Sequence, residues 1–204
     1  MSSSRGPEAG EFTCVLTGDA LFSVAHPHTL IEDGLVYEVQ GDMNEGLSNL
    51  ASSGSFKLPA DGQLPLKCVD VVQWANLRHV QLDKSGFIKH WQRYIGALQQ
   101  HIEATKEDGI KLSDEFMLRT HRFMRLELLH RFEELDFLVG ASEVSHGPLG
   151  ILHYKEEDPL TPYIYFFADG VQRAAAPGRS TSSLGEAVLS SPISPVVAPT
   201  SNLD

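Results

Sequence analysis

Cysteine is scarce in this sequence of 204 residues: only Cys14 and Cys68 occur, and they form no CxxC pair. A cysteine-based zinc site is therefore not expected. The first ten residues lack an apolar run and contain a glutamate, so we expect no signal peptide. Both cysteines are accordingly predicted to be free thiols in a reducing compartment, which indicates an intracellular protein, cytoplasmic or nuclear rather than secreted.

Long apolar runs and catalytic motifs are also missing. No stretch approaches the roughly 20 apolar residues of a transmembrane helix, so no membrane partner is expected. The sequence has no nucleophile elbow, no phosphate-binding glycine loop and no nicotinamide fingerprint. There are thus no positive grounds for an enzyme, and we expect no cofactor. Absence of motifs does not exclude an enzyme, because many active sites are assembled from scattered positions.

One short pattern resembles a metal site. Glu127-x-x-His130 has the spacing of half a di-iron carboxylate centre. Such a centre needs a second Glu-x-x-His and two further glutamates, and the sequence contains no second copy of the motif. We therefore expect no metal.

The composition is that of a globular protein, with 42% hydrophobic and 21% charged residues. This length and composition favour a single domain with tails. The formal net charge of -11 argues against nucleic-acid binding through the overall field of the molecule.

The amino-terminal part of the domain is expected to be a small β-meander of three or four strands, from about Glu11 to Gln40. Phe12, Cys14 and Leu16 alternate with other residues, as in a half-buried strand. The Asp33-Gly34 pair between two β-prone runs predicts a hairpin.

The domain boundaries follow from shifts in composition. We predict a disordered amino terminus over 1–10, a single domain over 11–172, a flexible loop over 41–65 and a disordered Ser/Pro-rich tail over 173–204. Residues 66–82 are compatible with a helix or a strand, and the spacing of their apolar residues favours a helix.

The clearest periodic pattern begins at Ser85, a predicted N-cap. Apolar residues then recur at steps of three and four, so they lie on one helical face. The helix is expected to end near Gly109. The residues of this stripe are Ile88, Trp91, Ile95, Leu98 and Ile102.

A second helix is predicted from Ser113, followed by Asp114 and Glu115 at the positive end of the helix dipole, to Gly140. The short connection makes the two helices antiparallel neighbours. The apolar residues expected in the core or at an interface of this helix are Met124, Leu128 and Leu135.

The carboxy-terminal part of the domain turns extended again. Two strands are predicted, at 149–154 and 163–167, separated by a loop at 155–162. The second run is apolar on both faces, which suits a central strand or a strand that a partner covers. The predicted fold class is therefore α+β: a small antiparallel β-meander packed with an antiparallel helical hairpin, with disordered tails.

Positive charge is concentrated in the predicted hairpin. The segment 78–131 carries a net charge of +3, and the remainder carries -14. Arg119, Arg122 and Arg125 are three residues apart and share one broad side of the second helix. With Lys89 and Arg93 they are candidates for binding an acidic peptide, a phosphorylated segment or a phosphate backbone. The alternative is a solvated face whose arginines form ion pairs with nearby acids.

Three functional hypotheses remain open. The first is a non-catalytic interaction or regulatory module, in which the hairpin binds another protein, self-associates or packs on its own sheet. The second is an enzyme or binding protein with an aromatic-lined cavity for a small molecule. The third is a nucleic-acid-associated regulator that uses the basic helix face. Ser191 and Ser194, each followed by proline, are candidate phosphorylation sites in the tail.

Overall fold

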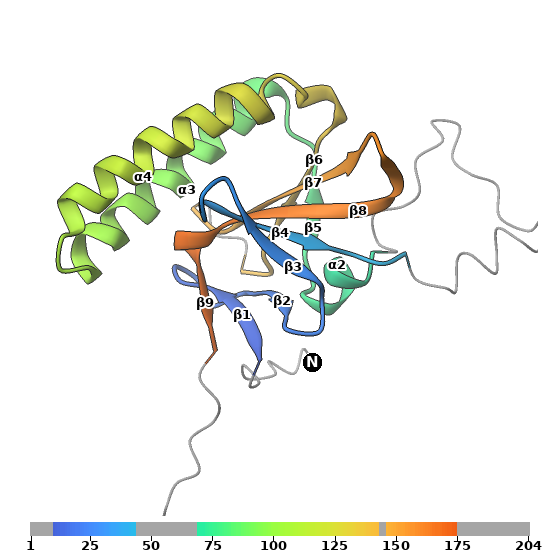
Figure 1. Ribbon diagram of the computed structural model, residues 1–204, viewed down its shortest axis with the longest axis horizontal. Coiled ribbons are helices and arrows are strands. Elements are labelled where there is room, and N and C mark those ends of the chain that lie inside the picture. The colour runs from blue at the N-terminus through green and yellow to red at the C-terminus, as the bar shows by residue number, and fades with distance from the viewer. Residues whose placement is uncertain (1–9, 44–68, 143–145, 175–204) are drawn as a thin grey trace, which may run out of the picture.

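The computed structural model describes residues 10–43, 69–142 and 146–174. The strands in these ranges form two antiparallel sheets. They are β1 (Glu11–Cys14), β2 (Ala20–Ser23), β3 (His28–Ile31), β4 (Val36–Gln40), β5 (Arg78–Val80), β6 (Asp136–Val139), β7 (Leu149–Lys155), β8 (Asp158–Phe167) and β9 (Val171–Arg173). The larger sheet has the order β3-β4-β8-β7-β6-β5, and the smaller one the order β2-β1-β9 (Figure 1).

A helical hairpin covers one face of the six-stranded sheet, and the three-stranded sheet covers the other (Figure 1). This arrangement of three layers confirms the predicted α+β class with antiparallel sheets and a helical hairpin. The helical elements are α2 (Asp70–Trp74), α3 (Lys84–Thr105), α4 (Gly109–Phe123), the π-helical turn η2 (Met124–Leu128), and the 3-10 turns η3 (Phe132–Glu134) and η4 (Ala168–Gly170).

Alternation along the strands divides the core into two clusters. In β7, Leu149 and Ile151 pack against the hairpin, whereas Leu152 packs against the three-stranded sheet and α2. In β8, Phe167 packs against the hairpin and Phe166 packs on the side of the three-stranded sheet. Successive side chains of a strand point to opposite faces, so a strand that is apolar at every position must be covered on both sides. The predicted central position of the second carboxy-terminal strand is confirmed, because β8 lies between β4 and β7.

The hairpin predicted at Asp33-Gly34 is also confirmed, because β3 and β4 pair through that turn. The prediction of one meander from Glu11 to Gln40 is wrong. β1 and β2 belong to the three-stranded sheet, and β9 closes that sheet from the far end of the chain. Local patterns identify strands, but the pairing of β1 with β9 is non-local and leaves no trace in either segment.

The second helix is much shorter than predicted. Helix α4 ends at Phe123, and its apolar spacing continues through η2 and η3 into β6. Leu135 therefore precedes a strand instead of lying on a helix, and Gly140 follows that strand. Apolar residues at 128, 132 and 135 satisfy the helical period, but pairing of β6 with β5 and β7 prevails over this local preference.

The helix starts differ from the predicted ones. Asp83, not Ser85, is the N-cap of α3, and its carboxylate accepts a hydrogen bond from the backbone N–H of Gly86 at 2.7 Å. Helix α4 begins at Gly109, so Ser113 is an interior residue. The buried Ser113 hydroxyl lies 2.9 Å from Glu103 Oε1 and 2.9 Å from the Ile110 carbonyl oxygen.

Two connecting segments also need correction. The helix expected within 66–82 is only the five-residue α2, and β5 follows it. The loop expected over 155–162 is a tight turn at Glu156 and Glu157, because β8 already begins at Asp158. At the edges of the predicted disordered segments, Arg173 belongs to β9 and Met43 forms a bridge with Val69.

The predictions for the remainder of 1–10, 41–65 and 173–204 lie outside the described residues, as does Cys68. Cys14 is a buried free thiol. Within the described ranges, no helix combines the length and the apolar content that crossing a membrane requires.

The close approach of α3 and α4 depends on a glycine. A Cβ atom at Gly109 would lie 2.5 Å from the carbonyl oxygen of Glu103 and 2.8 Å from that of Ile102, and backbone atoms cannot move aside. We expect Gly109→Ala to lower the free energy of unfolding by roughly 1–3 kcal/mol. The matched control is Gly96→Ala, because a Cβ at Gly96 meets no atom within 4 Å.

Gly96→Ala is expected to raise the free energy of unfolding by about 0.5–1 kcal/mol, since alanine has the higher helix propensity. Urea unfolding should therefore show that the free energy of unfolding falls in Gly109→Ala and rises in Gly96→Ala. Shifts of the same sign would contradict the assignment of Gly109 to the helix contact.

Candidate functional site

The apolar stripe of the first helix is already covered. Trp91, Ile95, Leu98 and Ile102 are buried in the core between hairpin and sheet, and Ile88 packs at its edge. The residues expected to form the stripe of the second helix contact the same cluster: Leu128 is buried, and Met124 and Leu135 are half-buried. This stripe packs on the chain's own sheet, so an interface with a partner must use other residues.

The outer side of α4 and of the following turn η2 presents apolar residues to solvent. Leu118 is 74% exposed and Leu126 is 50% exposed, although both are large hydrophobic residues. Arg122 and Arg125 are exposed beside them. Positions 118, 122 and 125 share one side of the helix, opposite the buried Phe116. We call Leu118, Arg122, Arg125 and Leu126 the Leu-Arg patch.

The guanidinium groups of Arg122 and Arg125 have no ion pair or hydrogen bond within the described part of the chain. Arg119 differs from them. Its guanidinium donates hydrogen bonds to the carbonyl oxygens of Glu32 and Asp33 at 2.6 and 2.8 Å. Both acceptors lie in the β3–β4 turn and have positive φ angles of 51° and 54°. Arg119 therefore holds this turn against the hairpin, and the three arginines do not form one equivalent strip.

Lys89 and Arg93 lie on α3 and are exposed. Because the helices are antiparallel, the start of α3 lies beside the end of α4. The rings of Trp91 and His121 mark this proximity, with centroids 5.0 Å apart. The two basic residues of α3 are therefore at the same end of the hairpin as the Leu-Arg patch.

Other candidates from the sequence do not assemble into a site. Ser191 and Ser194 lie outside the described residues. Glu127 and His130 are both exposed around the end of η2. Across 10–43, 69–142 and 146–174, no three side chains of His, Cys, Asp or Glu are placed to hold a metal ion together.

Sequence reasoning missed a cluster of charged and aromatic side chains on the hairpin-facing side of the sheet. Glu38 on β4 is 8% exposed, and His153 on β7 is 1% exposed. The Glu38 carboxylate accepts a hydrogen bond from Lys155 Nζ at 2.6 Å, and its other oxygen lies 3.7 Å from His153 Nε2. We call Glu38, His153, Lys155, Tyr163 and Tyr165 the Glu38 cluster.

Aromatic rings enclose these polar groups. The imidazole of His153 stacks on Tyr165 with ring centroids 4.1 Å apart and an interplanar angle of 29°. The ammonium of Lys155 lies 3.9 Å from the centroid of the Tyr163 ring, a cation–π contact. Arg131 approaches from beyond η2, and its guanidinium donates to the carbonyl oxygen of Tyr154 at 2.8 Å. The two ring contacts restrict His153 and Lys155, which both lie next to Glu38.

The electrostatics of the cluster favour a neutral imidazole. Burial, together with the positive charges of Arg131 and Lys155, lowers the pKa of His153 to about 4. Neither of its buried ring nitrogens has a hydrogen-bonding partner within the described residues. Burial and the nearby Glu38 carboxylate raise the pKa of Tyr165. The neutral imidazole and the buried carboxylate make the stability of this cluster dependent on pH.

Comparison with known proteins identifies the family. The model of the family described as "Translationally controlled tumour protein" matches residues 11–172. The chain belongs to the translationally controlled tumour protein family. Members from *Lateolabrax japonicus* and *Danio rerio* are 27% and 24% identical to it over 168 residues each. Each alignment covers 78% of this chain, and 95% and 94% of the respective relative.

Solved structures of this family share the fold. The *Schizosaccharomyces pombe* protein p23fyp matches with a TM-score of 0.62 and 21% identity, over 81% of this chain and 98% of that one. The *Caenorhabditis elegans* protein matches with a TM-score of 0.59 and 21% identity, over 80% and 97%. At 21% identity, the structural similarity shows a shared fold and nothing about function.

Proposed function

We propose that this chain is a protein-interaction module that binds an acidic, amphipathic helix of a partner protein on the Leu-Arg patch. The observation that supports this proposal is the exposure of Leu118 and Leu126 on either side of Arg122. Exposed large apolar residues that are rimmed by charge are typical of interaction surfaces. The chain belongs to the translationally controlled tumour protein family, and its sequence offers no catalytic motif. Both facts agree with a role in binding other proteins.

The chemistry of the patch selects the partner. Leu118 and Arg122 are four residues apart on α4, so their side chains form a ridge that packs into the grooves of another helix, and Leu126 follows on η2. Guanidinium groups bind carboxylates through paired hydrogen bonds. A partner helix with leucines on one face and glutamates beside them therefore complements both components. Because the patch is small, the complex is expected to be transient.

The direct test uses a fluorescein-labelled helical peptide of leucine and glutamate, and measures fluorescence anisotropy. Leu118→Gln with Leu126→Gln should weaken binding about tenfold, as expected for the loss of central apolar anchors. The matched control is Ile110→Gln, because Ile110 is on the same helix and 75% exposed. Equal weakening by the control would show that α4 binds the peptide without using the patch.

The arginines are tested separately. Arg122→Gln with Arg125→Gln should weaken binding and reduce its dependence on salt, whereas Lys111→Gln should change neither. A labelled RNA or DNA duplex tests the nucleic-acid alternative, and sedimentation velocity tests self-association. The nucleic-acid alternative would replace the proposal if the wild-type chain bound the duplex but not the peptide, and if the arginine variant no longer bound the duplex.

A further inference from the structure

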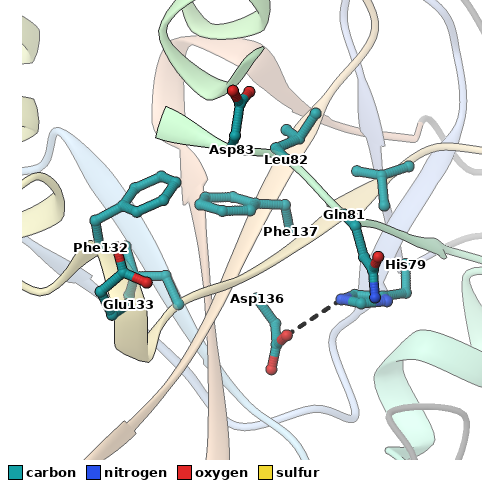
Figure 2. A pocket seen from close by; sticks show the side chains of 10 residues that line it. His79, Gln81, Leu82, Asp83, Phe132, Glu133, Asp136 and Phe137 are labelled. Carbon is teal, nitrogen blue, oxygen red and sulfur yellow. Dashed lines mark hydrogen bonds and ion pairs between the residues drawn. The ribbon is translucent and has the colours of Figure 1, made fainter. Parts of the chain in front are cut away.

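A second surface, lined by no residue of the Leu-Arg patch, contains an open cavity of about 480 Å³. It lies between β5, the start of α3 and the segment from η3 into β6, as Figure 2 shows. Its volume falls within the range of roughly 300–1,000 Å³ that is typical of ligand sites. The cavity combines three features that point to one kind of ligand.

The first feature is an aromatic wall. Phe132 and Phe137 lie side by side in Figure 2, with ring centroids 5.5 Å apart. Phe137 also stacks on the buried Phe87 at 4.8 Å, so its position is fixed by the core. Leu82 and Leu135 extend the apolar lining. Phe137 is only 3% exposed, so Phe132 is the ring of this wall that a flat group or an aliphatic chain can lie against.

The second feature is negative charge. Asp83, Glu133 and Asp136 line the cavity, and His79 is the one basic side chain among its lining residues. Asp136 Oδ1 lies 3.1 Å from His79 Nε2, and the N-cap oxygen of Asp83 accepts from Gly86. A carboxylate has about four acceptor positions, so these contacts leave most positions available. An anionic ligand would be repelled, and a cationic one attracted.

The third feature is an unpaired sheet edge. β5 pairs with β6 on one side, and on its other side no strand of the described residues pairs with it. The outward N–H and C=O groups of such an edge can accept an extended peptide as a further strand. Val80 and Gln81 connect this edge directly to the cavity lining.

We propose that the cavity binds an arginine side chain from a partner protein whose chain lies extended along β5. The planar guanidinium stacks on the half-buried Phe132 ring, which packs against the buried Phe137, and forms paired hydrogen bonds with Asp136 or Glu133. Arginine fits better than lysine: both cations can lie over a ring, but only the flat guanidinium can stack parallel to it and also form a planar, two-bonded pair with a carboxylate. This site is independent of the partner helix on α4.

The test measures fluorescence anisotropy of a labelled peptide of alternating arginine and valine. Asp136→Asn with Glu133→Gln should weaken binding about tenfold, because two charged acceptors are lost. The control is Glu156→Gln with Glu157→Gln in the β7–β8 turn, which removes the same charge from another exposed place. Asp83 is kept because it caps α3. Equal weakening in the control would overturn the proposal, because the loss of affinity would then come from the change in net charge and not from the cavity.

Three peptide arms complete the experiment with the wild-type chain. A peptide with glutamine in place of arginine should bind about tenfold more weakly, and equal binding would overturn the guanidinium assignment. A peptide N-methylated at alternate amides should also bind weakly, and undiminished binding would overturn strand addition. Free arginine that binds as tightly as the peptide would overturn the assignment to a protein partner. Leu118→Gln with Leu126→Gln should leave all these affinities unchanged, which separates this site from the Leu-Arg patch.

Discussion

Lowering the pH from 6.5 to 4 is expected to reduce the free energy of unfolding by about 3 kcal/mol through His153. Its pKa in the folded chain is about 4, below the ordinary value of 6.5. Between these two values the unfolded chain binds a proton that the folded chain does not. The stabilisation is therefore complete above pH 6.5, decreases as the pH falls and is lost below pH 4.

The variant that tests this expectation is His153→Phe. Phenylalanine retains the ring that stacks on Tyr165 and removes two buried nitrogens without hydrogen-bonding partners. The variant should be at least as stable as the wild type at neutral pH, because unsatisfied buried polar atoms are unfavourable. Urea unfolding at a series of pH values should show that the free energy of unfolding decreases less in acid for the variant than for the wild type.

Two details sharpen the measurement. Burial also lowers the pKa of His26 and of His90, so a residual loss of stability in acid should remain in His153→Phe. The exposed His130 provides the control variant His130→Phe, which should keep the wild-type dependence on pH. If His153→Phe and the wild type lost stability in parallel, the buried imidazole would not be the source of the effect.

The sequence was sufficient to predict the parts of this fold that depend on local periodicity. The stripe from Ile88 to Ile102 identifies α3 because five apolar residues follow one helical face. The Asp33-Gly34 turn and the double-sided apolar run of β8 are likewise local signals. The end of α4 was not predictable in this way, since Leu128 and Leu135 fit a helical period and only pairing with β5 and β7 makes β6 a strand.

The candidate sites were less predictable, because they depend on register between distant strands. Alternation places His153 on the same face as Ile151, and Glu38 on the same face as Val36. Only the pairing of β4 and β7 with the two sides of β8 brings Glu38 and His153 together. The arginine spacing on α4 was visible in the sequence, but the contact of Arg119 with a distant turn was not.

The ion pair of the Glu38 cluster is expected to have the second large effect. Lys155→Met should lower the free energy of unfolding by about 3 kcal/mol, because it leaves the Glu38 carboxylate buried without its cation. Glu38→Gln added to Lys155→Met should recover much of this loss, since no unpaired charge then remains. The four unfolding free energies form a double-mutant cycle, and the coupling within it measures the interaction.

A surface pair provides the control cycle. Lys106 Nζ lies 2.5 Å from Asp169 Oδ1, but the lysine side chain is 44% exposed. Lys106→Met should therefore change the free energy of unfolding by less than about 1 kcal/mol. Coupling in the Glu38 cycle that is no larger than in this control would contradict a role for burial.

Lys155 also acts electrostatically on His153, so Lys155→Met can be tested by a second measurement, the dependence of stability on pH. The positive charge of Lys155 contributes to the low pKa of His153. Lys155→Met should thus raise that pKa and narrow the pH interval over which acid destabilises the chain, even though the variant is less stable at neutral pH. A variant that is destabilised equally at every pH would show that Lys155 acts on Glu38 alone and that the two effects are separate.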